Sequence, residues 1–186
     1  MKTKKIIAVI GMPGSGKSET IKYLEKKYSW PKIYFGQATF IRMKKDGLTL
    51  TQKNERLIRE KIRRELGMGA YAKLALPEIS QALKQSNIVL IESLYSWEEY
   101  KIIKNKFNGQ FKVIAIYASP ATRFSRLKKR KNRSLKTQKE FNERDWSEIE
   151  NIDKGGPIAM ADFTFINEAT TEELYKNIDE TVKKII

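Results

Sequence analysis

The sequence predicts an α/β fold of three layers, in which helices cover both faces of a five-stranded parallel sheet. Three observations lead to this prediction. Short apolar runs with the character of buried strands alternate with longer segments of helical periodicity. The first apolar run, residues 5–10, breaks into a glycine-rich turn that leads directly into a helix. The chain of 186 residues is long enough for one domain with a substantial core.

Five short apolar runs are predicted to be strands, because strands of parallel sheets are buried on both faces. They are residues 5–10, 32–35, 87–93, 111–119 and 162–167. Helical periodicity and helix end signals place helices between and after these strands. The expected helices are residues 17–28, 38–45, 51–66, 70–85, 96–107, 119–130, 138–150 and a final helix from residue 170 onward.

Several helix starts carry capping signals. Ser96 and Glu99 form the S-x-x-E pattern of a capping box, and residues 170–173 repeat this type of pattern. Ser119 precedes Pro120, and proline suits the first position of a helix. These signals fix where the helices that follow the strands begin.

Two segments depart from the strand–helix alternation. Residues 38–85 form a helical block without a strand. Residues 131–156 contain a basic polar stretch, one helix and most of the sequence DKGGP, which is expected to be a loop. We expect both segments to be excursions from the α/β core.

The composition excludes several kinds of site. The chain has no Cys and no His, which excludes disulfides, zinc–thiolate sites, Ser-His-Asp chemistry and histidine metal ligation. A net charge of +15 favours anionic partners such as phosphorylated small molecules, nucleic acid or acidic membranes. The apolar runs are too short for a membrane span or a signal peptide, so we expect a cytoplasmic protein.

The turn after the first strand fits G-x-x-x-x-G-K-[ST] at every required position. Its residues are Gly11, Met12, Pro13, Gly14, Ser15, Gly16, Lys17 and Ser18, and Glu19 follows them. Glycines let the backbone aim several N–H groups at phosphate oxygens at the start of a helix. Lys17 would reach the β- and γ-phosphates, and the Ser18 hydroxyl would coordinate Mg²⁺. The motif therefore predicts binding of ATP with Mg²⁺; it does not exclude GTP, although no N-K-x-D signature is present.

Glu92 ends the third expected strand and is the candidate acid beside the magnesium. It could hold the metal through water or orient an acceptor. The alternative is a polar group that merely ends a strand.

A row of arginines follows the fourth expected strand. At about 100° per residue its members fall on one narrow helical face. They are Arg123, Arg126, Arg130 and Arg133, and Arg144 follows in the next helix beside Asp145. Stacked cations are best tolerated when an anion lies between them, and guanidinium groups suit phosphate. The alternative is a solvated basic face.

A second arginine row lies in the helical block, at Arg56, Arg59 and Arg63, and Arg42 is a candidate fourth member. It borders an apolar stripe, so the helix would pack on one side and present guanidinium groups on the next. The alternative is that these arginines pair with glutamates at helical spacing, such as Glu55 and Glu60.

Together these parts resemble the nucleoside monophosphate kinase-like group of P-loop kinases over nearly the whole chain. The matching segments are GMPGSGKSE, ERLIRE, GMGAYAK, LYSWEEYK and GGPIAMADFTFINE. The chain looks closest to an adenylate kinase-related or dephospho-coenzyme A kinase-like branch. The resemblance implies that residues 38–85 bind the acceptor and that residues 131–156 form a lid.

The resemblance also implies site residues outside the phosphate loop. Donor-nucleotide contacts fall to Arg126 and Arg130 at the base of the lid and to Asn167 near the adenine. The expected catalytic residues are Lys17, Glu92, Arg126, Arg130 and Arg144. The expected acceptor-binding residues are Arg42, Arg56, Arg59, Arg63 and Glu92, and the metal ligands are Ser18 and Glu92.

The chain departs from this family pattern at two places. Dephospho-coenzyme A kinases carry an Asp just after the second strand, which would accept the proton of a ribose hydroxyl, whereas here residues 35–37 read Phe-Gly-Gln. An acceptor that is already a phosphate needs no such base, although Glu92 could supply one. Many relatives have Asp-Gly where this chain has Glu92-Ser93.

The expected function is transfer of the γ-phosphoryl group of ATP to a nucleoside monophosphate-type acceptor by a monomer or homodimer. Three alternatives remain open from the sequence. They are a dephospho-coenzyme A kinase, an ATPase or end kinase that acts on nucleic acid, and a non-catalytic nucleotide sensor.

Overall fold

The computed structural model describes residues 4–131 and 134–186. Its strands are β1 (Lys5–Ile10), β2 (Lys32–Tyr34), β3 (Ile88–Glu92), β4 (Phe111–Tyr117) and β5 (Phe163–Ile166). Its helices are α1 (Lys17–Tyr28), α2 (Gln37–Lys45), α3 (Gln52–Leu66), α4 (Ala70–Gln85), α5 (Trp97–Lys106), α6 (Pro120–Lys128), α7 (Gln138–Glu150), α8 (Gly155–Ala159) and α9 (Thr171–Ile185).

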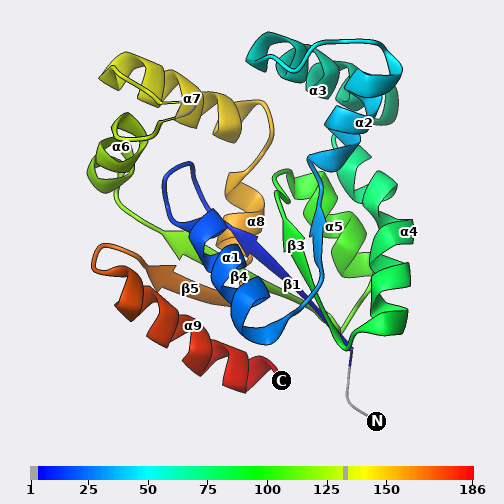
Figure 1. Cartoon of the computed structure of the whole chain (residues 1–186), viewed down its shortest axis with the longest axis vertical. Coiled ribbons are helices and arrows are strands. Elements are labelled where there is room, and N and C mark those ends of the chain that lie inside the picture. The colour runs from blue at the N-terminus through cyan, green and yellow to red at the C-terminus, as the bar shows by residue number, and fades with distance from the viewer. Residues whose placement is uncertain (1–3, 132–133) are drawn as a thin grey trace.

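All five strands are parallel and lie in the order β2-β3-β1-β4-β5, which confirms the predicted sheet (Figure 1). The first strand of the chain is therefore central: Ile7 of β1 lies beside Leu90 of β3 and Lys112 of β4. The strand order reverses on either side of β1. In open parallel sheets, ligands bind at the carboxyl edge of such a switch point.

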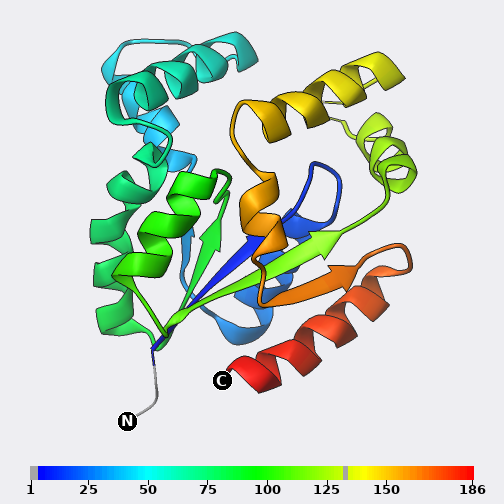
Figure 2. The same ribbon diagram turned by 180° about the vertical axis from the view of Figure 1, so that it is seen from behind.

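Alternation along β1 divides the core into two layers. Ile6, Ala8 and Ile10 face one way, and Ile7 and Val9 face the other. Helices α4 and α5 supply apolar side chains to the first layer, and α1 and α9 supply them to the second. Figures 1 and 2 show these two pairs of helices on opposite faces of the sheet, which confirms the three-layer prediction.

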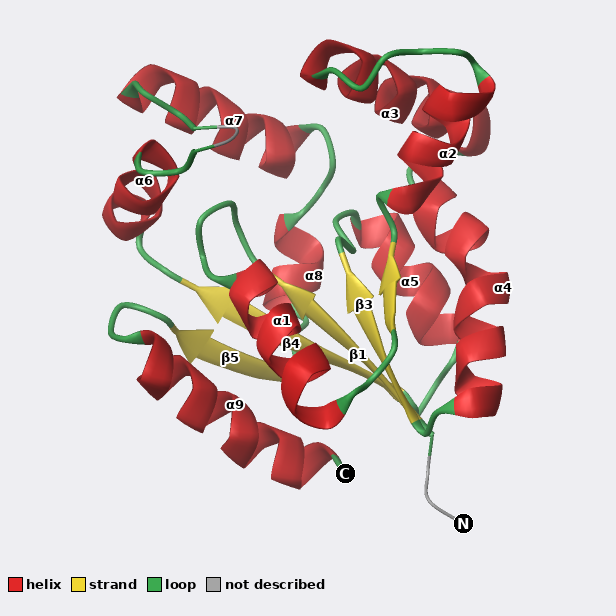
Figure 3. Ribbon diagram, in the orientation of Figure 1, coloured by secondary structure: helices red, strands yellow, loops and turns green. Residues whose placement is uncertain are grey.

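Two helical arms extend beyond the carboxyl ends of the strands. Figure 3 shows α2 and α3 in one arm, α6 and α7 in the other, and the loop between β1 and α1 below them. The first arm begins the block 38–85, and the second contains most of the segment 131–156. Within the described residues, every helix is too short or too polar to cross a membrane.

Two local expectations are wrong. Residues 153–157 are not all loop, because helix α8 begins at Gly155 and packs closely: a Cβ atom on Gly156 would lie 2.9 Å from the ring of Trp97. Helix α6 ends at Lys128, so Arg130 lies beyond it and does not continue one helical face with Arg123 and Arg126. Arg133, the fourth member of that expected row, lies outside the described residues.

Candidate active site

The glycine-rich turn joins the central strand to α1 with backbone angles that favour glycine. Gly11, Gly14 and Gly16 have φ values of +143°, +83° and +111°. At Gly16 the space is also closed, because a Cβ atom there would lie 2.3 Å from Nδ2 of Asn167. The turn therefore depends on both the conformational freedom and the small size of glycine. Its neighbours Met12, Pro13 and Ser15 complete the loop.

Lys17, in the first turn of α1, folds back over this loop. Its Nζ atom donates a hydrogen bond to the carbonyl oxygen of Met12 at 2.9 Å. Burial lowers the pKa of Lys17 well below its usual value, and the charges of Lys154, Arg144 and Arg130 lower it further, whereas Glu148 opposes the change. Three other cations are therefore close enough to repel the ammonium group of Lys17, and an anion bound by Lys17 would relieve this repulsion.

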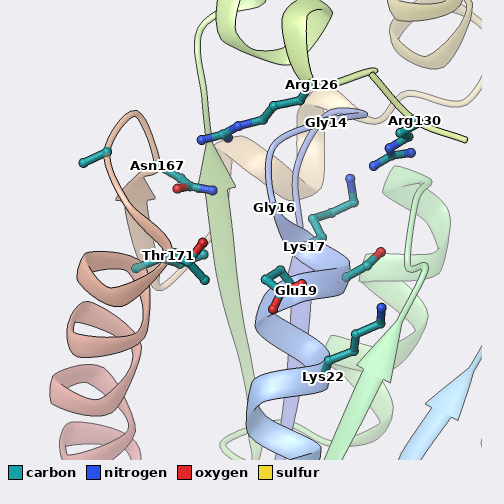
Figure 4. Close-up of a pocket in the computed structure, with 12 residues that line it drawn as sticks. Gly14, Gly16, Lys17, Glu19, Lys22, Arg126, Arg130, Asn167 and Thr171 are labelled. Carbon is teal, nitrogen blue, oxygen red and sulfur yellow. The ribbon is translucent and has the colours of Figure 1, made fainter. Parts of the chain in front are cut away.

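A cavity of about 470 Å³ opens beside the loop (Figure 4). In Figure 4 the side chain of Arg126 extends over the loop toward Asn167, and Arg130 lies above Lys17. The Nη1 atom of Arg126 is buried without a hydrogen-bond partner among the described residues. The cavity is lined by Gly14, Gly16, Lys17, Ser18, Glu19, Lys22, Arg126, Arg130, Asn167, Ala169, Thr171 and Leu174. The structure therefore brings the donor-side predictions Lys17, Ser18, Arg126, Arg130 and Asn167 together.

The segment after β5 supports both the phosphate loop and the arm. Asn167 is buried, and its Nδ2 atom donates to the carbonyl oxygen of Ser15 at 2.7 Å. The next residue, Glu168, accepts hydrogen bonds from the Ser119 backbone N–H and the Thr122 hydroxyl at the start of α6. Asn167 thus braces the loop from below, in addition to lining the cavity.

Glu19 is exposed at the edge of the cavity and is tied to the last helix. Its carboxylate accepts a hydrogen bond from the hydroxyl of Tyr175, whose ring stacks on Tyr23 with centroids 3.9 Å apart. One turn farther along α9, Asp179 accepts from the hydroxyls of Tyr23 and Tyr28 at 2.7 and 2.9 Å. These contacts fix α9 against α1.

The Tyr175–Glu19 contact predicts a pH effect on stability. The hydrogen bond to Glu19, with burial, raises the pKa of Tyr175 to about 12, against about 10 in an unfolded chain. Because the folded state holds this proton more tightly, the contribution is complete below about pH 10 and is lost as the pH rises toward 12. Urea unfolding of wild type and Tyr175→Phe should therefore differ less at about pH 11.5 than at about pH 8. Equal differences at both values would contradict the assignment.

Arg123 is the member of the arginine row that the structure buries. It forms two hydrogen bonds with the carboxylate of Asp145 in α7, at 2.9 and 2.6 Å. It also donates to the carbonyl oxygens of Ala118, after β4, and Pro13, in the phosphate loop. Arg123 therefore joins the loop to the α6–α7 arm rather than facing a ligand.

Arg144 does not pair with its neighbour Asp145. Its Nε atom donates to Glu148 at 3.4 Å, and Glu148 also accepts a hydrogen bond from Lys154. Lys154 is 2% exposed and lies 4.4 Å from the ring centroid of Tyr95. The sequence does not single out Glu148 or Lys154, and Tyr95 enters only as one residue of the segment LYSWEEYK. Lys154 directly precedes the segment GGPIAMADFTFINE and is not part of it.

Glu92 lies at the carboxyl end of β3, as predicted, but it has a local partner. Its carboxylate lies 3.2 Å from Nζ of Lys32, and Lys32 also lies 3.1 Å from the carboxylate of Glu25. A magnesium ion in a phosphate site takes one or two carboxylates and otherwise substrate oxygens and water. Ser18 and Glu92 fit this donor set if Glu92 acts through water or leaves Lys32.

Ser93 has a strained backbone conformation of the kind that glycine adopts easily, and glycine is the residue that many relatives have at this position. Its φ value is +70°, a left-handed conformation that costs about 1 kcal/mol for a residue with a Cβ atom. Its hydroxyl hydrogen-bonds with that of Tyr95 at 3.1 Å. We expect Ser93→Gly to leave the free energy of unfolding unchanged or raise it by up to about 1 kcal/mol, as measured in urea. A clear loss would show that the Tyr95 hydrogen bond outweighs the strain.

The predicted acceptor arginines separate into two kinds. Three are paired with carboxylates: Arg42 with Asp46 and Glu65, Arg56 with Glu60, and Arg59 with Glu55. Arg63 is different, with a side chain only 15% exposed, its guanidinium 5.2 Å from the ring centroid of Tyr71, and Nη2 3.9 Å from the buried Glu99. The Nε atom of Arg63 and Oε1 of Glu99 have no hydrogen-bond partner among the described residues.

Comparison with known proteins shows the family of the chain. A family model described as an AAA domain matches residues 7–151. A UPF0200 protein of Thermococcus onnurineus is 36% identical over 183 residues, which cover 97% of this chain and 98% of the relative. The UPF0200 protein MJ1399 of Methanocaldococcus jannaschii is 36% identical over 182 residues, covering 97% and 90%.

Solved kinases share the fold at low identity. A shikimate kinase from Acinetobacter baumannii in complex with shikimate has a TM-score of 0.62 at 18% identity, covering 98% of this chain and 95% of the other. A gluconokinase from Sinorhizobium meliloti has a TM-score of 0.57 at 14% identity, covering 100% and 95%. The chain therefore belongs to the UPF0200 proteins and to the family of the matched AAA domain model, and it has the fold of the P-loop nucleoside monophosphate kinase-like proteins.

Proposed function

We propose that this protein transfers the γ-phosphoryl group of ATP to a nucleoside monophosphate-type acceptor. The observation that carries the proposal is the cavity beside the phosphate loop, which is lined by Lys17 and by Arg126. The Nη1 atom of Arg126 is buried without a hydrogen-bond partner among the described residues. A buried polar atom without a partner is costly, and a phosphate oxygen would supply the missing acceptor. The phosphate loop, the cations around it and the cavity together suit a nucleoside triphosphate.

In this proposal, the loop N–H groups and Lys17 hold the triphosphate, and Arg126 with Arg130 closes over it. Ser18 and Glu92 would hold Mg²⁺, which would neutralise charge on the phosphate groups. Exclusion of water by the α6–α7 arm would favour transfer over hydrolysis. Catalysis then rests mainly on positioning and on charge neutralisation.

The acceptor would lie toward the α2–α3 arm, with Arg63 as its main phosphate contact. Arg63 has a carboxylate, Glu99, 3.9 Å from its Nη2 atom, but its buried Nε atom lacks a hydrogen-bond partner among the described residues. Arg42, Arg56 and Arg59 are more closely paired with carboxylates. The segment after β2 offers Phe35, which is buried, and no acid that could accept a hydroxyl proton. Glu92 is held by Lys32. These features favour an acceptor whose nucleophile is an anionic phosphate oxygen.

An acceptor screen tests the proposal. Thermal unfolding would be measured with a non-hydrolysable ATP analogue and Mg²⁺, with each candidate acceptor added in turn, because a true acceptor stabilises the ternary complex. A coupled assay would then compare nucleoside monophosphates with dephospho-coenzyme A. Stabilisation and turnover with a monophosphate support the proposal, whereas turnover only with dephospho-coenzyme A assigns a hydroxyl acceptor.

Two further outcomes would overturn the proposal. Tight binding of ATP with no transfer to any acceptor would indicate a nucleotide sensor. Turnover that depends on RNA or DNA and falls steeply with salt would indicate a polyanionic partner. The matched variants are Arg63→Ala and Arg56→Ala: the first should abolish stabilisation by the acceptor, and the second, in an exposed pair, should leave it unchanged.

A further inference from the structure

The carboxylate of Glu148 contacts two cations and interacts electrostatically with a third, Lys17 of the phosphate loop. It accepts hydrogen bonds from Lys154, which precedes α8, and from Arg144, one turn earlier in α7. Burial favours its neutral form, but Lys154, Arg144 and Lys17 outweigh burial and hold the pKa of Glu148 below its ordinary value. We call Lys17, Arg144 and Lys154 the cation trio.

Lys154 in particular needs an anion close to it. Lys154 is nearly inaccessible to solvent, and burial lowers its pKa despite Glu148, so its charge depends on a close counter-ion. Lys17 is the residue that the P-loop motif assigns to the β- and γ-phosphates. The ammonium group of Lys17 is therefore expected to bind the terminal phosphate groups, and it also interacts electrostatically with Glu148.

We propose that Glu148 is a built-in occupant of the site for the terminal phosphoryl group of the nucleotide. In the ligand-free protein its carboxylate neutralises the cation trio, and the γ-phosphoryl group of a nucleoside triphosphate displaces it. This inference rests on the proposed function, because it assigns the trio to the group that is transferred. It adds a competing internal anion at the donor site.

The side chain of Glu148 can move away from its cationic partners while helix α7 stays attached to the rest of the protein. Asp145, in the preceding turn of α7, stays fixed by its two hydrogen bonds to Arg123. A γ-phosphoryl group carries more charge than a carboxylate and would take over the trio, since two anions at one point repel. A nucleoside diphosphate ends before the γ position and would leave Glu148 in place. The carboxylate of Glu148 thus weakens the binding of a nucleoside triphosphate but not that of a nucleoside diphosphate.

The test compares two nucleotides on matched glutamate variants. Dissociation constants for ADP and for a non-hydrolysable ATP analogue, each with Mg²⁺, would be measured by calorimetry on wild type, Glu148→Gln and Glu143→Gln. Glu143 is an exposed carboxylate on the same helix, 3.9 Å from Lys139. Glu148→Gln should bind the ATP analogue roughly threefold to tenfold more tightly, the effect of one nearby charge, and bind ADP within about twofold of wild type. Glu143→Gln should change neither constant.

A purely structural role for Glu148 predicts a different result. Loss of its contacts would then weaken both nucleotides in parallel, and a ratio of the two constants equal to that of wild type overturns the inference. Since Glu148→Gln leaves Lys154 unpaired, Glu148→Asp serves as the second variant. It keeps the charge, and its shorter reach should change the ratio in the same direction by a smaller factor.

The outcomes for the inference and for the proposed function are separable. If wild type binds both nucleotides but transfers phosphate to no acceptor, the proposed function fails, and the ratio still decides the place of Glu148. If transfer occurs and both variants keep the wild-type ratio, the inference fails alone. If neither nucleotide binds wild type, both fail.

Discussion

Replacing Lys17 with methionine is expected to reduce phosphoryl transfer by about a thousandfold or more, because the transferred group loses the cation placed against it before the reaction. The stability of the ligand-free protein, in contrast to its activity, should not fall. Burial and the neighbouring cations lower the pKa of Lys17, so its charge destabilises the ligand-free fold at neutral pH. The ligand-free variant should therefore unfold at the same or a higher temperature than wild type.

Steady-state kinetics and thermal unfolding check this prediction on the same samples. The control is Lys26→Met, because Lys26 lies on the same helix, is exposed and does not line the cavity. It should leave both quantities unchanged. A folded Lys17→Met variant with full turnover would contradict the assignment of the donor site.

Replacing Arg123 with methionine is expected to lower the free energy of unfolding by about 3–5 kcal/mol. The substitution leaves the carboxylate of Asp145, 8% exposed, without the two hydrogen bonds that hold it in the arm. A domain of this size has only about 5–15 kcal/mol of stability, so the loss is large. The variant also releases Pro13 in the phosphate loop, so affinity for ATP should fall with stability.

Urea unfolding measures this effect. The exposed pair Arg56–Glu60 provides the comparison, since Arg56→Met should cost no more than about 0.5 kcal/mol. The double variant Arg123→Met with Asp145→Leu should recover much of the loss, because it removes both buried charges. If Arg123→Met alone were as stable as Arg56→Met, the buried pair would not anchor the arm.

The sheet and the phosphate loop could be predicted because their signals are local. The strand runs, the caps at Ser96 and Ser119 and the glycine spacing each act within a few residues. The structure confirms the five-stranded parallel sheet. The predicted donor residues Lys17 and Arg126 line one cavity.

The pairs of Arg56 with Glu60 and of Arg59 with Glu55 follow helical spacing and were open from the sequence as an alternative. The partners of Asp145 and Lys154 could not be predicted, because they depend on how α7 packs on its surroundings. Neighbouring residues on a helix point about 100° apart. Asp145 therefore faces inward to Arg123, whereas Arg144 turns to Glu148. The sequence places Arg144 beside Asp145 and offers no reason to pair Glu148 with Lys154.

The hydrogen bond from Asn167 to Ser15 joins residues 152 positions apart. During synthesis the glycine-rich turn emerges among the first residues, whereas the amide that supports it arrives only after the last strand has been made. A growing chain therefore carries the whole glycine-rich signature long before the loop has its final support. Under the proposed function, ATP would stabilise the completed fold and could not guide the early steps of folding.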